Sequence, residues 1–212
     1  AITVTCEDHS FNTASLMEQD YGAGGGYTSE GYLIHTEAGK TYLYLQHQSD
    51  NDSHYINIFD LTTKTPVYTG FTGSSWSDSP ITDPDNFLLW DRLDVLGTYS
   101  AYREYHIGPD GMPQTEDELF RLGNANHENP VTLVSVRDLN VSVLNAGLQE
   151  QETIPSGTSF QITATDGKSF VEAKMDDGRS CRIPVVKDAD AWDWKINGVS
   201  EYECFEMLPY AG

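Results

Sequence analysis

The sequence contains no run of about 18 apolar residues, so we expect no membrane-spanning helix. Basic residues are scarce: 12 Lys and Arg stand against 33 Asp and Glu, and the formal net charge is −21. A surface this acidic repels phosphate backbones and anionic lipid headgroups. Nucleic acid is therefore not an expected partner, and the charge suits a soluble exported protein.

Cysteine is rare, and its spacing excludes two common uses. Cys6, Cys181 and Cys204 form no C-x-x-C pair, so neither a zinc ribbon nor a thioredoxin motif is predicted. Cys181 and Cys204 lie in the same C-terminal segment, and the sequence leaves open whether they form a disulfide or remain buried thiols. Cys6 is expected in a buried strand position.

Catalytic motifs are missing as well. Gly73-Ser74-Ser75-Trp76-Ser77 lacks the second glycine of a nucleophile elbow. Neither H-E-x-x-H nor a phosphate-binding glycine loop is present, and Gly22-Ala23-Gly24-Gly25-Gly26 is expected to be a flexible loop. The sequence therefore predicts no cofactor and favours a protein that is not an enzyme.

The residues that are present indicate a globular, mainly β protein. Hydrophobic residues make up 38% of the chain, and 12 Tyr against four Met favour strands, because aromatic side chains fit a half-buried pleated surface. The chain opens with a strand-like segment, residues 2–6, which fits a mature form whose export signal has been removed. We expect an extracellular or cell-surface protein, and a monomer.

The pattern of the first 130 residues predicts antiparallel sheet. Residues 29–36, 41–48, 55–61 and 65–71 alternate as four strands of a meander that resembles a propeller blade. A closed propeller needs at least about four blades. Since residues 87–112 supply only part of a second blade, an open, sandwich-like packing is predicted.

Two short helices and a domain boundary are also predicted. Thr115 and Glu118 have capping-box spacing for a helix within 113–122, and Ser200 and Glu203 have it for a helix over 201–207. The polar, breaker-rich stretch 123–130 predicts the boundary, with an antiparallel β domain over 1–130 and a second β domain over 131–212.

In the second domain the apolar pattern predicts a hairpin register. A three-residue loop with Gly178 in the left-handed conformation sets Ala173 opposite Cys181 and Val171 opposite Ile183. A two-residue turn would instead place Val171 opposite Pro184. Only the first register gathers apolar side chains on one face.

The C-terminal part resembles a small bacterial SH3-like barrel. The resemblance rests on Ile154-Pro155-Ser156-Gly157-Thr158, on Thr165-Asp166-Gly167-Lys168 and on Asp177-Gly178-Arg179. The stretch 196–212, together with 82–88 and 97–103, is similar to secreted proteins of unknown function from anaerobic Gram-positive gut bacteria. This resemblance implies an extracellular location and an adaptor-like architecture, and it implies no catalytic residues.

Metal sites are not predicted. Pairing Thr36 with Thr41 would place His35 and His47 on opposite faces of a sheet, where they cannot share a metal. The acidic loop 49–53 between His47 and His54 and the cluster of Asp188, Asp190 and Asp193 offer only weak divalent sites, because neither has the spacing of a known calcium loop.

The best functional lead is a pair of tryptophans. Alternation over residues 190–196 predicts Trp192, Trp194 and Ile196 on one face, which either closes the core or lines a groove with Tyr202 or Tyr210 nearby. Trp76, in a Ser-rich loop, is a second candidate that is either exposed or folded under its own loop.

We expect a secreted, non-catalytic binding module. The ligand predicted is a cell-wall peptide or surface polymer, bound by Trp192, Trp194, Tyr202 and Trp76, with a polysaccharide or protein partner as the other options. The alternative is a carbohydrate-active enzyme or its accessory carbohydrate-binding domain, which would need two carboxyl groups about 5–10 Å apart in a cleft within 1–130.

Overall fold

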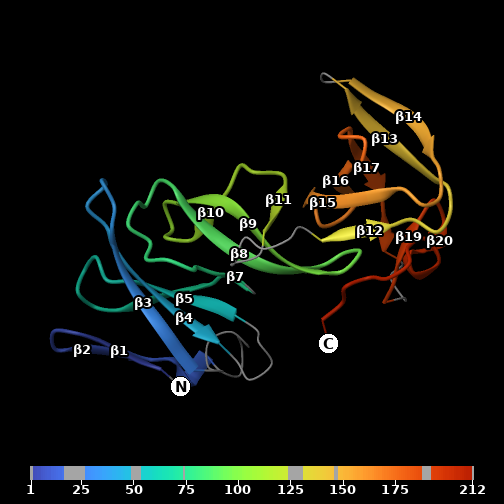
Figure 1. Cartoon of the computed structure of the whole chain (residues 1–212). Coiled ribbons are helices and arrows are strands. Elements are labelled where there is room, and N and C mark those ends of the chain that lie inside the picture. Colours follow the sequence, from blue (N-terminus) through green and yellow to red (C-terminus); the bar gives the residue numbers. More distant parts are fainter. Residues whose placement is uncertain are drawn as a thin grey trace. The chain divides into compact units, whose positions relative to one another are not determined.

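A computed structural model describes residues 2–16, 27–48, 54–73, 75–123, 131–145, 148–187 and 192–211. Strands dominate (Figure 1), and the helical segments in these ranges are two 3-10 turns, Thr13–Leu16 and Glu201–Glu203. No helix in the described part has the length and apolarity to cross a membrane. The prediction of a mainly β, antiparallel, sandwich-like protein is confirmed.

The chain divides into two compact units. Unit 1 comprises Ala1–Asp91 and Arg103–Glu116, and unit 2 comprises Arg92–Tyr102 and Asp117–Gly212. The predicted boundary placed all of 1–130 in the first domain, whereas the observed division moves Arg92–Tyr102 and the stretch from Asp117 onward into the second. The reason is a long hairpin, β8 (Phe87–Asp94) and β9 (Thr98–Ile107), whose strands supply residues to both units.

Unit 1 contains the predicted four-strand meander. Its strands pair antiparallel in chain order and are β3 (Tyr27–His35), β4 (Thr41–Gln48), β5 (His54–Asp60) and β6 (Val67–Phe71). A two-strand ribbon precedes it, made of β1 (Thr3–Cys6) and β2 (His9–Asn12). Cys6 in β1 is half-buried rather than buried.

The core of unit 1 lies between the meander and the hairpin residues of the same unit. Alternate residues of the meander point to this core and are joined there by residues of β8 and β9, which makes the packing sandwich-like. Buried side chains from the meander are Tyr32, Ile34, Tyr42, Tyr44, Ile56 and Ile58, and those facing them include Phe87, Leu89, Tyr105 and Ile107. The hydroxyl of Tyr44 donates a 2.6 Å hydrogen bond to the carbonyl of Gly111.

The register of β3 and β4 differs from the prediction by one residue. His35 pairs with Thr41, and His47 pairs with Thr28. Because Thr41 and His47 are six residues apart in one strand, the two histidines share a face, and the prediction of opposite faces was wrong. They still lie about 20 Å apart along the sheet, so a shared metal remains excluded by distance.

Unit 2 is built on a second antiparallel sheet. Its consecutive pairings link β12 (Thr132–Val134), β15 (Ser159–Thr165), β16 (Phe170–Met175), β17 (Ser180–Pro184), β13 (Leu139–Asn145) and β14 (Leu148–Ile154). A bridge between Ser135 and Phe205 extends the sheet beyond β12. Among the described strands this series stays open, so the barrel expected here does not close through backbone pairing.

The remaining strands are short. β7 (Ser75–Trp76) pairs with β8, β10 (Pro113–Gln114) pairs with β9, and β11 (Phe120–Gly123) pairs with both β9 and β15. A small separate sheet consists of β18 (Val186–Lys187), β19 (Trp194–Ile196) and β20 (Val199–Ser200).

The predicted hairpin register of β16 and β17 is confirmed. Ala173 pairs with Cys181 and Val171 pairs with Ile183, and all four side chains are buried. Gly178 has φ +88°, as the three-residue loop requires. The local apolar pattern therefore selects the pairing, because a shift of one residue would turn every apolar side chain away from the core.

Replacing Gly178 with alanine is expected to lower the free energy of unfolding by about 1–2 kcal/mol. No atom lies within 4 Å of the added Cβ, so the cost is the left-handed backbone and not a clash. Gly178→Asn is the matched control, since asparagine tolerates this conformation better. Urea unfolding of both variants measures the difference, and equal stabilities would show that the loop does not need this backbone.

Two cysteines lie in the core of unit 2. Cys181 and Cys204 are both buried and both present as free thiols. Burial raises the pKa of each thiol, to about 12 for Cys181, which keeps them protonated. Of the two alternatives that the sequence left open, the structure contains the buried thiols.

The helix predicted within 113–122 is absent, and the one predicted over 201–207 is reduced to a single turn. The segment 113–122 forms β10, an irregular stretch and the start of β11. The segment 201–207 makes one 3-10 turn, and the Ser200 side chain makes no capping hydrogen bond. Sheet pairing prevails there, because the amide of Val136 donates to the carbonyl of Cys204, and that of Glu206 to Val134.

Candidate functional site

The structure separates the predicted tryptophan pair. Strand β19 begins at Trp194, so the alternation that was expected to align Trp192 with Trp194 does not extend to Trp192. The Trp192 side chain is 97% exposed, whereas that of Trp194 is 5% exposed. The prediction of one common face was therefore wrong, and only Trp192 is available to a ligand.

Trp194 is a core residue of unit 2. Its indole N–H donates a 2.8 Å hydrogen bond to the carbonyl of Asp94, and the ammonium group of Lys187 lies 5.3 Å from the centre of its ring. The ring packs in the cluster that also contains Ile196 and Phe205. A buried indole with a satisfied N–H stabilises the unit and offers little surface for recognition.

A fully buried carboxylate organises the C-terminal segments. Glu201 accepts a 3.0 Å hydrogen bond from the amide of Trp194, and the Tyr210 hydroxyl lies 2.9 and 2.8 Å from its two oxygens. The backbone of Leu96 also bonds to this carboxylate. Glu201 thus ties the start of β19, the hairpin tip and the C-terminal tail together.

Burial raises the pKa of Glu201. The hydrogen bonds from Trp194, Tyr210 and Leu96 act in the opposite direction, and the nearby charge of Asp193 raises the pKa further. Burial dominates because the carboxyl group is desolvated. The tyrosine is affected in turn: burial, followed by its bond to Glu201, raises the pKa of Tyr210.

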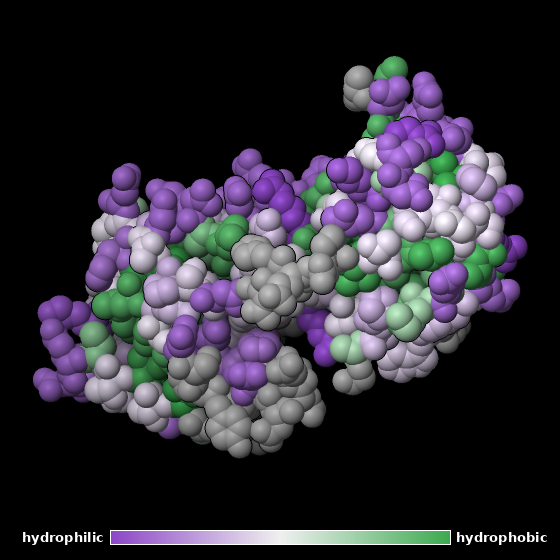
Figure 2. Space-filling view, in the orientation of Figure 1, coloured by the Kyte–Doolittle hydropathy of each residue, from purple (hydrophilic) through white to green (hydrophobic). Residues whose placement is uncertain are grey.

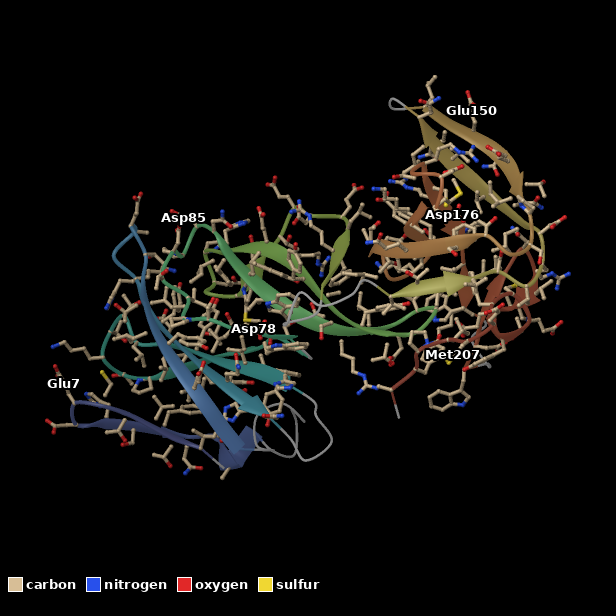
Figure 3. All side chains as sticks on the ribbon, in the orientation of Figure 1. Glu7, Asp78, Asp85, Glu150, Asp176 and Met207 are labelled. Carbon is tan, nitrogen blue, oxygen red and sulfur yellow. The ribbon has the colours of Figure 1, made fainter. Side chains whose placement is uncertain are left out.

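Exposed apolar side chains lie on the segments that this carboxylate joins. Trp192 precedes Trp194 by two residues and Tyr202 follows Glu201 directly, so the Glu201–Trp194 bond brings their segments together. Tyr202 is 62% exposed, and the centre of its ring lies 6.1 Å from the centre of the Tyr210 ring. Met207, labelled in Figure 3, is 77% exposed. We call Trp192, Tyr202, Met207 and Tyr210 the C-terminal apolar surface.

Sequence reasoning found part of this surface. Trp192 and Tyr202 were predicted, whereas Met207 and the role of Glu201 were missed. The signal for Glu201 was hidden because Ser-Glu-Tyr-Glu matches a capping box, in which the glutamates face solvent at a helix start. Its burial follows from the fold, in which the carboxylate is closed off from solvent and bonds to Trp194 and Leu96.

The fourth predicted residue, Trp76, lies in unit 1 and is half-buried in the short strand β7. Its indole N–H donates a 3.0 Å hydrogen bond to Oδ1 of Asp78, and its ring lies 4.8 Å from that of His54. The ring is therefore neither free in solvent nor folded under its loop. It lies at the surface, fixed by two neighbours.

Several candidate metal sites lie outside the described residues. These are the loop 49–53, together with Asp188 and Asp190; the glycine-rich stretch 22–26 is outside as well. Within the described ranges, no group of three or more His, Cys, Asp or Glu side chains is arranged to hold a metal ion.

Comparison of the chain with protein-family models, with curated proteins and with solved structures gave no match.

Proposed function

We propose that the protein is a non-catalytic, extracellular binding module that holds a cell-wall peptide on the C-terminal apolar surface. The observation that carries the proposal is the 97% exposure of Trp192, on a segment that Glu201 joins to the segment of a second exposed aromatic residue, Tyr202. Exposed tryptophan and tyrosine are costly to leave in water, and both are enriched where proteins bind partners.

Anchoring of this surface supports a binding role. The backbone on both sides is held by Glu201, so Trp192 and Tyr202 project from segments whose positions are fixed. Such preorganisation lowers the entropic cost of binding. A free loop that carried the same side chains would pay that cost on every association.

We also propose an SH3-like architecture for unit 2, with a sheet that stays open, and part of its strand arrangement supports this. A meander of β15, β16 and β17 is flanked by β12 on one side, and the Phe205 segment pairs beyond β12. SH3-like domains are commonly adaptors that bind peptides. The similarity to secreted proteins of Gram-positive gut bacteria supports an extracellular location, and we propose that the protein acts there as a monomer.

The charge around the surface favours an amine-bearing peptide. Asp193, Glu203 and Glu206 belong to the same segments as Trp192, Tyr202 and Met207. Carboxylates beside apolar rings provide flat contact area together with acceptors for a cationic group. Peptides that contain a free amino group match both features, whereas anionic polymers do not.

Sedimentation with purified Gram-positive peptidoglycan tests the proposal. Trp192→Ala in the intact chain is expected to weaken binding about tenfold, and Tyr202→Ala by a similar factor, because each removes a ring from the contact. Leu148→Ala is the matched control, since Leu148 is an exposed apolar residue of the same unit on the edge strand β14. If the wild-type chain does not sediment, or if Trp192→Ala sediments equally well, the proposal is wrong.

A further inference from the structure

A second aromatic surface lies on unit 1. Trp76 of β7 and Trp90 of β8 are directly opposed in an antiparallel pair, so their side chains project from the same face. Residues alternate along β8: Phe87 and Leu89 point into the core, and Leu88 and Trp90 point to the other face. Leu88 is 38% exposed and Trp90 is half-buried. Two indoles therefore lie side by side at the surface, next to an exposed leucine.

The position of the Trp76 ring is fixed from two directions. Asp78 holds the indole N–H, and the His54 ring stacks against it at 4.8 Å with a tilt of 36°. On the opposite face of the same strand pair, the Ser75 hydroxyl donates a 2.7 Å hydrogen bond to Asp91. Both strands are thereby locked in register, and the ring is ordered before any ligand arrives.

The side chain that hydrogen-bonds to the Trp76 indole is an acceptor. Asp78 uses Oδ1 for the indole, and this exposed side chain (Figure 3) also carries a second oxygen. Unit 1 contains 16 Asp and Glu against three Lys and Arg, and hydrophilic residues cover much of the visible face in Figure 2. A ligand rich in hydroxyl donors fits such a surface, while an anionic ligand is repelled.

The short strand argues against a peptide at this place. β7 contributes two residues to its sheet, which is too short an edge for pairing with an extended chain. Adjacent rings with flat apolar faces instead match the axial C–H faces of successive pyranose units, whose hydroxyls point outward to acceptors such as Asp78.

We propose that Trp76, Trp90 and Asp78 form a binding site for an uncharged, β-linked glycan chain. Trp76 and Trp90 stack against neighbouring sugar rings, and Asp78 accepts from a sugar hydroxyl while it holds the Trp76 indole. This inference goes beyond the proposed function, because it places a second ligand site on a different unit of the chain.

Affinity gel electrophoresis of the intact chain tests this site, with hydroxyethylcellulose as the neutral glycan and polygalacturonate as the anionic one. The wild type is expected to be retarded by hydroxyethylcellulose and not by polygalacturonate. Trp76→Ala and Trp90→Ala are each expected to raise the apparent dissociation constant at least tenfold (about 1.4 kcal/mol).

Two further variants distinguish a loss of glycan binding from a loss of folding. Asp78→Ala removes the acceptor of the Trp76 indole N–H at an exposed position, where the substitution does not disturb the core. It is expected to weaken binding to hydroxyethylcellulose about threefold. Asp78→Asn keeps an acceptor for the indole and is expected to retain most of the affinity. Leu33→Ala, an exposed apolar residue elsewhere in unit 1, is the control that should behave as wild type.

The outcomes separate this site from the C-terminal apolar surface. Trp192→Ala should bind hydroxyethylcellulose normally, and Trp76→Ala should bind peptidoglycan peptides normally. An absence of retardation in the wild type would overturn the glycan site whatever the peptide result. Equal retardation of wild type, Trp76→Ala and Asp78→Ala would overturn it too.

Discussion

Replacing Trp194 with alanine is expected to lower the free energy of unfolding by about 3–5 kcal/mol. The substitution empties a buried volume in the core of unit 2 and leaves the carbonyl of Asp94 without its 2.8 Å donor. The cation–π contact from Lys187 is lost as well. Urea unfolding monitored by circular dichroism gives the change directly.

The matched control is Trp192→Ala, two residues away in the sequence. Because Trp192 is 97% exposed, its replacement should change stability by no more than about 0.5 kcal/mol. The pair therefore distinguishes a structural tryptophan from a ligand-facing one. Similar stability losses in both variants would show that Trp192 is packed in solution, and would remove it from the proposed surface.

Replacing Glu201 with alanine is expected to lower the free energy of unfolding by about 3 kcal/mol or more, because several buried donors lose the acceptor that they share. The amide of Trp194, the hydroxyl of Tyr210 and the backbone of Leu96 all bond to this carboxylate. Tyr210→Phe is the milder control: it removes a single donor and should cost about 1 kcal/mol. Equal losses in both variants would show that Glu201 does not act as a common acceptor.

Glu201 is also expected to make the free energy of unfolding depend on pH. Burial raises the pKa of Glu201 in the folded chain, so the folded state binds its proton more tightly than the unfolded state does. The resulting stabilisation is complete below the unfolded pKa of about 4.3 and is lost as pH rises through the folded pKa. Ionised Glu201 therefore weakens the fold at neutral pH.

A difference measurement isolates this group from the other carboxylates. The free energy of unfolding of the wild type minus that of Glu201→Gln should fall between pH 4 and pH 7, with a slope of at most about 1.4 kcal/mol per pH unit. A difference that rises with pH would mean that the hydrogen bonds outweigh burial, and that the folded pKa is lowered.

Local patterns predicted the parts of the fold that depend on neighbouring residues. The meander of unit 1 and the hairpin of β16 and β17 follow from alternation and from one left-handed glycine, Gly178. Long-range pairing decided the places where local signals failed. The segment after Ser200 has a capping box, yet its amides and carbonyls pair with Val134 and Val136 in the sheet.

At the candidate site, too, local patterns predicted some features and long-range contacts decided the others. Alternation holds only inside a strand, and the sequence carries no mark to show that β19 begins at Trp194 and not at Trp192. A buried glutamate is also invisible locally, because its partners Leu96 and Tyr210 lie in a distant hairpin and in the tail. Residue type predicted which aromatic side chains to consider, and only tertiary contacts distinguish the exposed ring from the core ring.

The indole N–H signals of the four tryptophans test the central claim most directly. In a proton–nitrogen correlation spectrum, assigned with single Trp→Phe variants, we would titrate the intact chain with a soluble amine-bearing stem peptide. The Trp192 signal should shift in a saturable manner, while that of Trp194, hydrogen-bonded to Asp94, should stay in place. A Trp192 signal that does not move at saturating peptide would contradict the account.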